Sequence, residues 1–251
     1  MTEPLVRWRE GGERAPVFCI HPIGGHVTEY AGLVELIAPA HPLYAIRSRG
    51  PAAEPATLAA MAVDYAAVVQ TVRPAGPVAL VGWSLGAVVA HAIACELDEV
   101  ALVAMIDPLL AVPAVADELR AAVMMAIQIF HPAPPPRPVI RSMLEELDED
   151  DPAAWCLARG LVPAHVAHAE LAGTLALFGK HRALLAAHRP GTCRAPLQVW
   201  RARGAAPFDW AAHTSAACTA RQLAADHFTI MRAPHVAAIA ADLNSALSAF
   251  A

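Results

Sequence analysis

Residues 78–95, VALVGWSLGAVVAHAIAC, lie within a stretch, 74–95, that carries no Asp, Glu, Lys or Arg. An uncharged span of this length can cross a bilayer as one helix. Its internal order predicts something else, because the aliphatic run at 78–81 is typical of a buried parallel strand, whereas 87–95 is rich in helix formers. Between them lies GWSLG, a G-x-S-x-G pattern typical of a tight strand-to-helix turn that exposes a serine, Ser84. We therefore expect the middle of an α/β sheet and not a membrane anchor.

The two glycines of this pattern, Gly82 and Gly86, have a steric role in such a turn. The flanking chain passes close to the serine backbone, and a Cβ at either position would collide with it. The pattern thus predicts a serine side chain held at a sharp backbone turn.

Composition limits the other possibilities. A chain of 251 residues with 57% hydrophobic residues can bury a large core and is compatible with one domain, 1–251. The net charge of -5 gives no basic surface for nucleic acid. The N-terminal segment MTEPLVRWREGGERAP is charged and lacks the apolar centre of a secretory signal. Five cysteines without C-x-x-C spacing indicate reduced thiols, so we expect a cytoplasmic protein that binds neither nucleic acid nor a membrane.

Short apolar runs alternate with helical patterns along most of the chain, which is typical of βαβ units around a mostly parallel sheet flanked by helices. The expected strands are 16–20, 42–46, 78–81, 100–106, 196–200 and 221–223, and the expected helices are 27–37, one that begins after Thr57, 87–95 and 234–249.

The alternation stops between residues 111 and 192. This segment contains the proline-rich HPAPPPRP, an acidic run from Glu145 to Asp151 that we interpret as a solvated turn, and a helical pattern at 165–188. We interpret the segment as a helical lid inserted over the carboxyl ends of the strands, where open α/β sheets bind their ligands.

A serine hydroxyl is a weak nucleophile at neutral pH and needs a base, which is itself oriented by a third group. The late segment ADHFTIMRAPHV offers two histidines. His227 lies in the loop before the last helix, at the edge of the sheet where catalytic groups gather, whereas His235 lies in the first turn of that helix and is expected to face solvent. We predict His227 as the base.

Three aspartates are candidates for the third group. Asp107 directly follows the strand at 100–106, whereas Asp209 follows a later strand and suits the commoner acid position of a Ser, Asp, His order. Asp226 is too close to His227 in the chain to be a good partner. The residues alone leave Asp107 only slightly ahead of Asp209.

Acyl transfer also needs backbone N–H groups that already point at the developing oxyanion. One predicted donor is the N–H of Leu85, the residue after the nucleophile. The second is the N–H of Ile23 in the loop HPIGG, whose glycines let the backbone turn after the first predicted strand.

Five segments occur in one order: VFCIHPIGG, YAIRSRG, VALVGWSLGAVVAHAIA, ALVAMIDP and ADHFTIMRAPHV. Together they resemble the terminal thioesterase domains of nonribosomal peptide and polyketide synthetases, over nearly the whole chain. The resemblance implies an α/β-hydrolase fold, with Ser84 as the nucleophile and His227 as the base. It also implies Asp107 and not Asp209 as the acid. Two departures, Ala87 in place of a second glycine and the short link CELDEV, leave this order of groups intact.

The implied partner is an acyl or peptidyl carrier protein, whose phosphopantetheine arm holds the substrate as a thioester. The resemblance implies no cofactor and no metal bound by the domain itself, and it does not specify an oligomeric state. It implies release of the acyl or peptidyl chain through an acyl-Ser84 ester, which either water or a nucleophile of the same chain then attacks. Hydrolysis and macrocyclisation both stay open.

Three alternatives remain: a free-standing editing thioesterase, a small serine esterase, and a non-catalytic binding protein on the same scaffold. The ends at Met1 and Ala251 fit a free-standing protein and also a domain of a larger synthetase.

Several side chains are expected to have mainly structural roles. His91 is predicted to be a core residue, and His21 and His26 are predicted to shape the HPIGG loop or to contact substrate. His165 and His168 have an H-x-x-H spacing that could hold a metal, but no Cys or Glu stands out as a further ligand. We therefore expect two polar positions on a lid helix. Apolar residues expected in the core of the lid are Trp155, Leu161, Leu171, Leu175 and Phe178.

Overall fold

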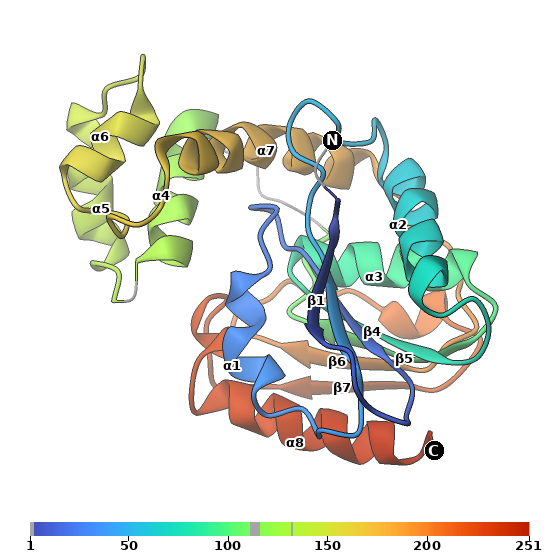
Figure 1. Cartoon of the computed structure of the whole chain (residues 1–251). Coiled ribbons are helices and arrows are strands. Elements are labelled where there is room, and N and C mark those ends of the chain that lie inside the picture. The colour runs from blue at the N-terminus through green and yellow to red at the C-terminus, as the bar shows by residue number, and fades with distance from the viewer. Residues whose placement is uncertain (1–2, 111–115, 132, 251) are drawn as a thin grey trace.

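In the computed structural model of this chain, the uncharged stretch divides at Ser84 into a strand, β4 (Val78–Trp83), and a helix, α3 (Leu85–Glu96) (Figure 1). The structure describes residues 3–110, 116–131 and 133–250. Every residue of β4 is buried, and the strand lies between β2 and β5 in the middle of the sheet. Burial explains why this stretch carries no charge.

The described residues form one seven-stranded sheet with the order β1-β3-β2-β4-β5-β6-β7. β1 pairs antiparallel with β3, and all other neighbouring strands are parallel. The strands besides β4 are β1 (Leu5–Arg9), β2 (Val17–Ile20), β3 (Leu43–Ile46), β5 (Val100–Ile106), β6 (Leu197–Arg201) and β7 (Cys218–Gln222).

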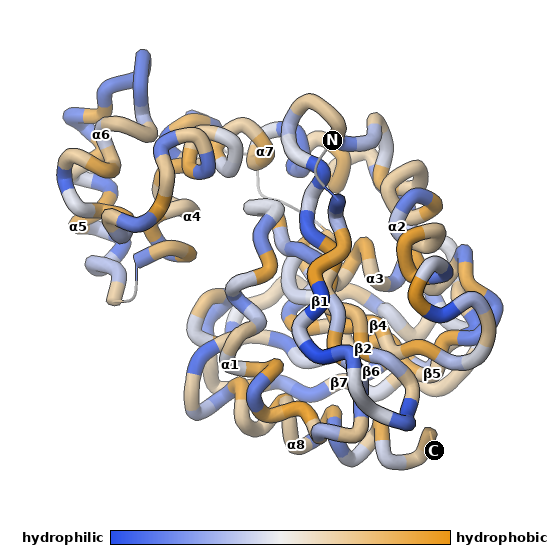
Figure 2. Tube along the Cα trace, in the orientation of Figure 1, coloured by the Kyte–Doolittle hydropathy of each residue, from blue (hydrophilic) through white to orange (hydrophobic). Residues whose placement is uncertain are grey.

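Helices cover both faces of this sheet, and each face has its own core (Figure 1). One core contains α2 and α3, and the other contains α1 and α8. Figure 2 shows hydrophobic colour along the central strands that both cores share. These helices are α1 (Ala31–Val34), which follows the 3-10 turn η1 (Thr28–Tyr30), α2 (Leu58–Val72) and α8 (His235–Ser248).

The described part of the segment between β5 and β6, here called the insertion, contains four α-helices. The helix predicted at 165–188 is present from His168 to Ala187, so His165 lies in the turn before the helix and not, as the sequence predicts, on the helix itself. Figure 1 shows α4, α5 and α6 to one side of the sheet, with the long helix α7 running from them to a position over it. The helices are α4 (Glu118–Phe130), α5 (Arg137–Met143) with the 3-10 turn η2 (Leu144–Glu146), α6 (Pro152–Ala158) and α7 (His168–Ala187).

Helix α7 belongs to two cores along its length. Its N-terminal half packs through Leu171, Leu175 and Phe178 against α4 and α6, in the core of the insertion. Its C-terminal half packs through Leu184 and Leu185 into the core that contains α2 and α3. The insertion is therefore joined to the sheet by one continuous helix.

Most expected elements are present, with further differences outside the insertion. The helix expected at 27–37 is reduced to η1 and the four residues of α1, which contains Gly32, a residue that disfavours helix. The strand expected at 221–223 begins earlier, at Cys218, because its backbone pairs with β6 from Leu197 onward. The sequence does not predict β1, because LVRWR mixes two arginines with apolar residues. A partly exposed edge strand tolerates such arginines.

Candidate active site

Ser84 lies at the turn between β4 and α3 in a conformation that L-residues rarely adopt, with φ 59° and ψ -124°. Its N–H donates to the carbonyl of Ile106 (N···O 2.9 Å), which ties the turn to β5. The two glycines have the predicted steric role. A Cβ at Gly82 would lie 2.1 Å from the carbonyl oxygen of Gly86, and one at Gly86 would lie 2.2 Å from that of Ile20.

His227 lies in the loop after β7 and faces Ser84. Its Nε2 is 3.1 Å from Ser84 Oγ, although the two residues are 143 positions apart in the chain. The indole N–H of Trp83 donates to the carbonyl of His227 (3.0 Å), and the two rings lie against each other with centroids 5.1 Å apart. The residue beside the serine thus holds the loop that carries the histidine.

Asp107 lies at the carboxyl end of β5 and is only 2% exposed. One carboxylate oxygen accepts the Nδ1–H of His227 (2.6 Å), and the other accepts the backbone N–H of Ala202 (2.8 Å). Like Ser84, Asp107 has a positive φ, 42°. Both oxygens are therefore engaged, and the imidazole is oriented with Nε2 toward the serine.

The other two aspartates are engaged elsewhere. The exposed Asp209 accepts the N–H of Ala211 (3.1 Å) at the start of a 3-10 turn, η3 (Trp210–His213). Asp226 accepts the N–H groups of Phe228 and Thr229, both at 2.9 Å, before a second such turn, η4 (Thr229–Met231). Of the three candidate aspartates, the structure brings only Asp107 to His227.

The loop of residues 21–25, here called the oxyanion loop, borders the same site. Ile23 and Leu85 line one cavity together with Ser84. Within the described part of the chain, neither the Ile23 N–H nor the Leu85 N–H donates to a protein acceptor. Both predicted donors thus border the cavity at Ser84 without a protein acceptor among the described residues.

The cavity has a volume of about 180 Å³, and its walls are apolar or aromatic apart from Ser84 and His227. The sheet and its loops supply one side, and the insertion supplies Met125 and Ile129 from α4 and Phe178 and Leu185 from α7. Phe178, expected in the core of the lid, therefore lies both in that core and in the cavity wall.

The other histidines singled out in the sequence lie apart from the reacting groups. His91 is fully buried against Trp210, as predicted, and burial lowers its pKa. His26 contacts the Thr174 hydroxyl of α7. His165 is exposed, and His168 contacts Asp151 (2.8 Å). His21 is fully buried beside Glu54 and His181, two residues that the sequence interpretation did not single out.

A family model described as "Thioesterase domain" matches residues 15–247. The chain belongs to the thioesterase domain family. Its thioesterase domain is similar to part of a dimodular nonribosomal peptide synthase of Bacillus subtilis (strain 168), with 42% identity over 110 residues, covering 41% of this chain and 5% of the relative. It is also similar to the atromentin synthetase invA5 of Paxillus involutus, with 28% identity over 269 residues, covering 93% of this chain and 27% of the relative. The chain thus spans a small part of these relatives.

Solved structures share the fold. A four-domain nonribosomal peptide synthetase bound to AMP and glycine matches with a TM-score of 0.80 and 24% identity, over 97% of this chain and 20% of that one. The NocB thioesterase domain in covalent complex with a fluorophosphonate nocardicin G analogue matches with a TM-score of 0.68 and 21% identity, over 97% and 99%. The α/β-hydrolase architecture predicted from the sequence is confirmed. No described helix of this thioesterase domain is both long and apolar enough to span a membrane.

Proposed function

We propose that this thioesterase domain releases an acyl or peptidyl chain from the phosphopantetheine thioester of a carrier protein, through an ester on Ser84. The observation that carries the proposal is the continuous hydrogen-bonded series from Ser84 Oγ through His227 to Asp107, at 3.1 Å and 2.6 Å. Its order and distances are those of a nucleophile, a general base and an orienting acid.

In the proposed acylation, Ser84 Oγ attacks the thioester carbonyl carbon while His227 Nε2 takes the hydroxyl proton. The carbonyl oxygen becomes an oxyanion that accepts the N–H groups of Ile23 and Leu85. When the tetrahedral intermediate collapses, the carbon–sulfur bond breaks and His227 gives the proton to the departing sulfur, which leaves as a thiol. Asp107 stabilises the imidazolium that exists between these two transfers.

Deacylation repeats the sequence with a second nucleophile: His227 takes its proton while it attacks the Ser84 ester, and returns that proton to Ser84 Oγ when the ester bond breaks. Water gives a free acid, and an amine or hydroxyl of the bound chain gives a ring. The apolar walls of the cavity support an acyl group with apolar substituents close to the reacting carbonyl. A folded-back chain in such a cavity gains from the proximity of its ends, which is worth about 7 to 11 kcal/mol in well-oriented reactions.

A carrier protein as partner is supported by the relatives, which are synthetases many times longer than this chain. The test compares kcat/KM for one acyl group on a carrier protein with that for the same acyl group on a small thiol. We expect the carrier-bound substrate to react faster and Ser84→Ala to be inactive on both. Equal rates would remove the carrier protein from the proposal and leave a serine esterase.

The product shows whether water or a nucleophile of the bound chain attacks the Ser84 ester. Mass spectrometry of products from a panel of acyl and peptidyl thioesters distinguishes a linear acid from a ring, which is lighter by one water. If only short, misprimed acyl groups of this panel turn over, the result would instead assign an editing role.

A further inference from the structure

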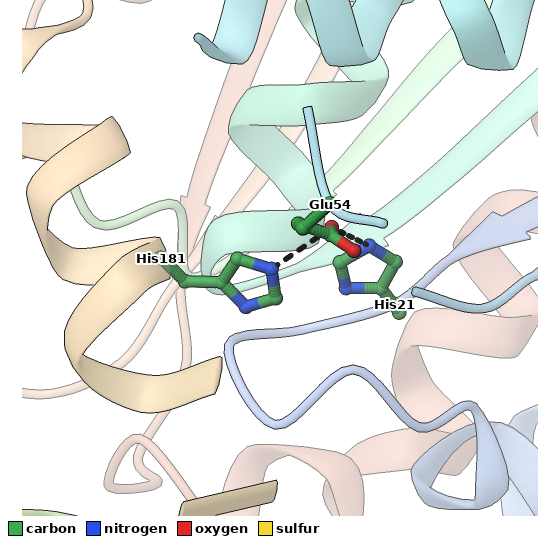
Figure 3. Close-up of side chains that lie close together, drawn as sticks. All are labelled: His21, Glu54 and His181. Carbon is green, nitrogen blue, oxygen red and sulfur yellow. Dashed lines mark hydrogen bonds and ion pairs between the residues drawn. The ribbon is translucent and has the colours of Figure 1, made fainter. Parts of the chain in front are cut away.

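Three buried titratable side chains meet next to the oxyanion loop (Figure 3). His21 comes from that loop, Glu54 from the loop between β3 and α2, and His181 from α7. Their side chains are 0% exposed. His181 Nε2 lies 3.0 Å and His21 Nε2 3.8 Å from the same oxygen of Glu54. The proposed reaction uses none of them directly, so their burial needs another explanation.

The two histidines hold the peptide groups on both sides of Ile23. The carbonyl of Pro22 accepts the Nδ1–H of His21 (2.8 Å) and the N–H of Gly25 (2.9 Å). The carbonyl of Ile23 accepts the Nδ1–H of His181 (2.7 Å). Because carbonyls only accept, both rings must carry a hydrogen on Nδ1. In a trans peptide the C=O and N–H point in opposite directions, so donors on the Pro22 carbonyl set the direction of the Ile23 N–H.

His181 is fixed at its other nitrogen by Glu54. Burial acts to raise the pKa of Glu54, but hydrogen bonds from His181 and Ser48 and the nearby His21 outweigh it, and the pKa falls below its usual value. The carboxylate therefore accepts the Nε2–H of His181, and its second oxygen accepts the Ser48 hydroxyl (2.5 Å) and the Arg49 N–H (3.1 Å). His181 thus donates through both ring nitrogens to acceptors in two different loops.

His21 is neutral in this arrangement. Burial and the neighbouring His181 lower its pKa to about 4. Since its Nδ1–H is used by the Pro22 carbonyl, its Nε2 accepts the hydroxyl of Tyr65 from α2 (2.8 Å). Two histidines and one carboxylate are also the residue types of a zinc site. Zinc-bound histidines typically donate their other ring N–H to a carbonyl, as both Nδ1–H groups do here. A cation would have to displace the Tyr65 hydroxyl and the proton between His181 and Glu54, so the cluster is complete as a hydrogen-bonded unit.

His181 occupies a special place on α7. It lies between Phe178, which packs in the core of the insertion, and Leu184, which packs in the core against the sheet. The preceding residue, Lys180, donates to the carbonyl of Glu54 (2.9 Å). A shift of α7 would therefore move the group that holds the Ile23 carbonyl.

We propose that His181, held by Glu54, is a positioning residue that fixes Ile23 from its carbonyl side and so couples the helical insertion to the oxyanion hole. His21 fixes the preceding peptide group, which carries the Ile23 N–H, so the two histidines together set the backbone of Ile23. The proposal rests on the proposed function, because it requires the Ile23 N–H to act as an oxyanion donor.

Two substitutions at one position separate the two hydrogen bonds of His181. The amide nitrogen of asparagine can take the place of Nδ1, and that of glutamine can take the place of Nε2. His181→Asn keeps a donor for the Ile23 carbonyl and loses the bond to Glu54, whereas His181→Gln does the reverse. We expect His181→Asn to retain most of the wild-type kcat. We expect His181→Gln to lose at least about tenfold in kcat with little change in KM, a part of the 10²–10³ that a missing oxyanion donor costs.

The second readout is independent of turnover. The carbonyl carbon of Ile23, labelled with ¹³C, should change its NMR shift in His181→Gln and keep it in His181→Asn. Equal losses of kcat in both variants that follow their losses of thermal stability would overturn the proposal, as would an unchanged Ile23 shift in His181→Gln. Stoichiometric Zn²⁺ binding that both variants lose would overturn it too. If the wild-type domain had no thioesterase activity but the Ile23 shift responded as expected, the proposed function would fail while His181 would still position Ile23.

Discussion

At the scale of single residues, the site depends on which hydrogen bonds each acidic group already makes. Asp107 is buried and uses one oxygen on the Ala202 N–H, so its second oxygen is fixed toward His227. Asp209 turns back onto the N–H of Ala211 two residues later. Asp209 is thus engaged in a local cap and not with the histidine, so a position after a strand is not sufficient to identify the acid.

Ser84→Ala should abolish turnover of any thioester, because no other hydroxyl lies at His227 Nε2 among the described residues. The fold should stay intact, since the change removes one oxygen from a backbone turn that the glycines hold. Steady-state kinetics and a thermal unfolding curve check both parts. Retained activity in a variant with an unchanged Tm would show that the nucleophile is elsewhere.

Asp107→Asn should lower kcat on the order of 10³–10⁴-fold, because an amide stabilises the wrong tautomer of the histidine and cannot balance an imidazolium. Asp209→Asn is the matched control, with the same chemical change at an exposed cap, and its kcat should stay near that of the wild type. The reverse order of the two effects would reassign the acid.

Glu29 should make stability fall as pH rises. Burial raises its pKa from 4.5 to about 7, against the opposing effect of its own N–H and of the Thr28 hydroxyl. Between pH 4.5 and pH 7 the folded state therefore holds a proton that the unfolded state has lost, and over this range the free energy of unfolding falls by roughly 3 kcal/mol. Urea unfolding of Glu29→Gln should match the wild type near pH 4 and exceed it at pH 8. A difference that does not change with pH would contradict this assignment.

At the scale of elements, the turn at Ser84 shows what a sequence pattern can establish. The steric roles of Gly82 and Gly86 could be predicted from the sequence. Gly82 is required by a close backbone approach within the turn itself, and Gly86 by a close approach to the adjacent strand. Other elements have no such local requirement. β1 mixes arginines with apolar residues as edge strands do, and α4 ends directly before a proline-rich run that obscures its helical pattern in the sequence.

Gly86→Ala should destabilise the domain strongly, by more than about 3 kcal/mol or to the point of insolubility, because the new Cβ would lie 2.2 Å from the Ile20 carbonyl oxygen. Gly173→Ala in α7 is the matched control, since a Cβ added there would meet nothing within 4 Å. It should stabilise the helix by about 1 kcal/mol. Urea denaturation midpoints of the two variants test both expectations, and similar midpoints would show that the turn tolerates a side chain.

At the scale of the whole molecule, α7 joins the insertion to the sheet and brings His181 to the oxyanion loop. The sequence predicts a helix here, but its apolar residues face two different cores, so no single apolar face indicates where the helix packs. The pair of His181 and Glu54 is 127 positions apart and belongs to no motif. Only the folded arrangement identifies it, whereas the order of Ser84, Asp107 and His227 follows from a pattern that many chains share.

Ile129→Trp should fill the cavity between α4 and Ser84. We expect kcat/KM to fall more for long apolar acyl thioesters than for an acetyl thioester, because the long chain must occupy the filled volume. Val139→Trp, at an exposed position of α5, is the control and should not change with chain length. An equal loss for all chain lengths in Ile129→Trp would indicate that the acyl group binds elsewhere.

The covalent ester on Ser84 is the central claim, and it can be observed directly. The domain is mixed with an acyl-carrier thioester, quenched with acid during the first turnover, digested, and analysed by peptide mass spectrometry. The account predicts the mass of the acyl group on the peptide that contains Ser84, and no such mass in Ser84→Ala. Consumption of the thioester by the wild-type domain with no acyl group on Ser84 at any time in the first turnover would contradict it.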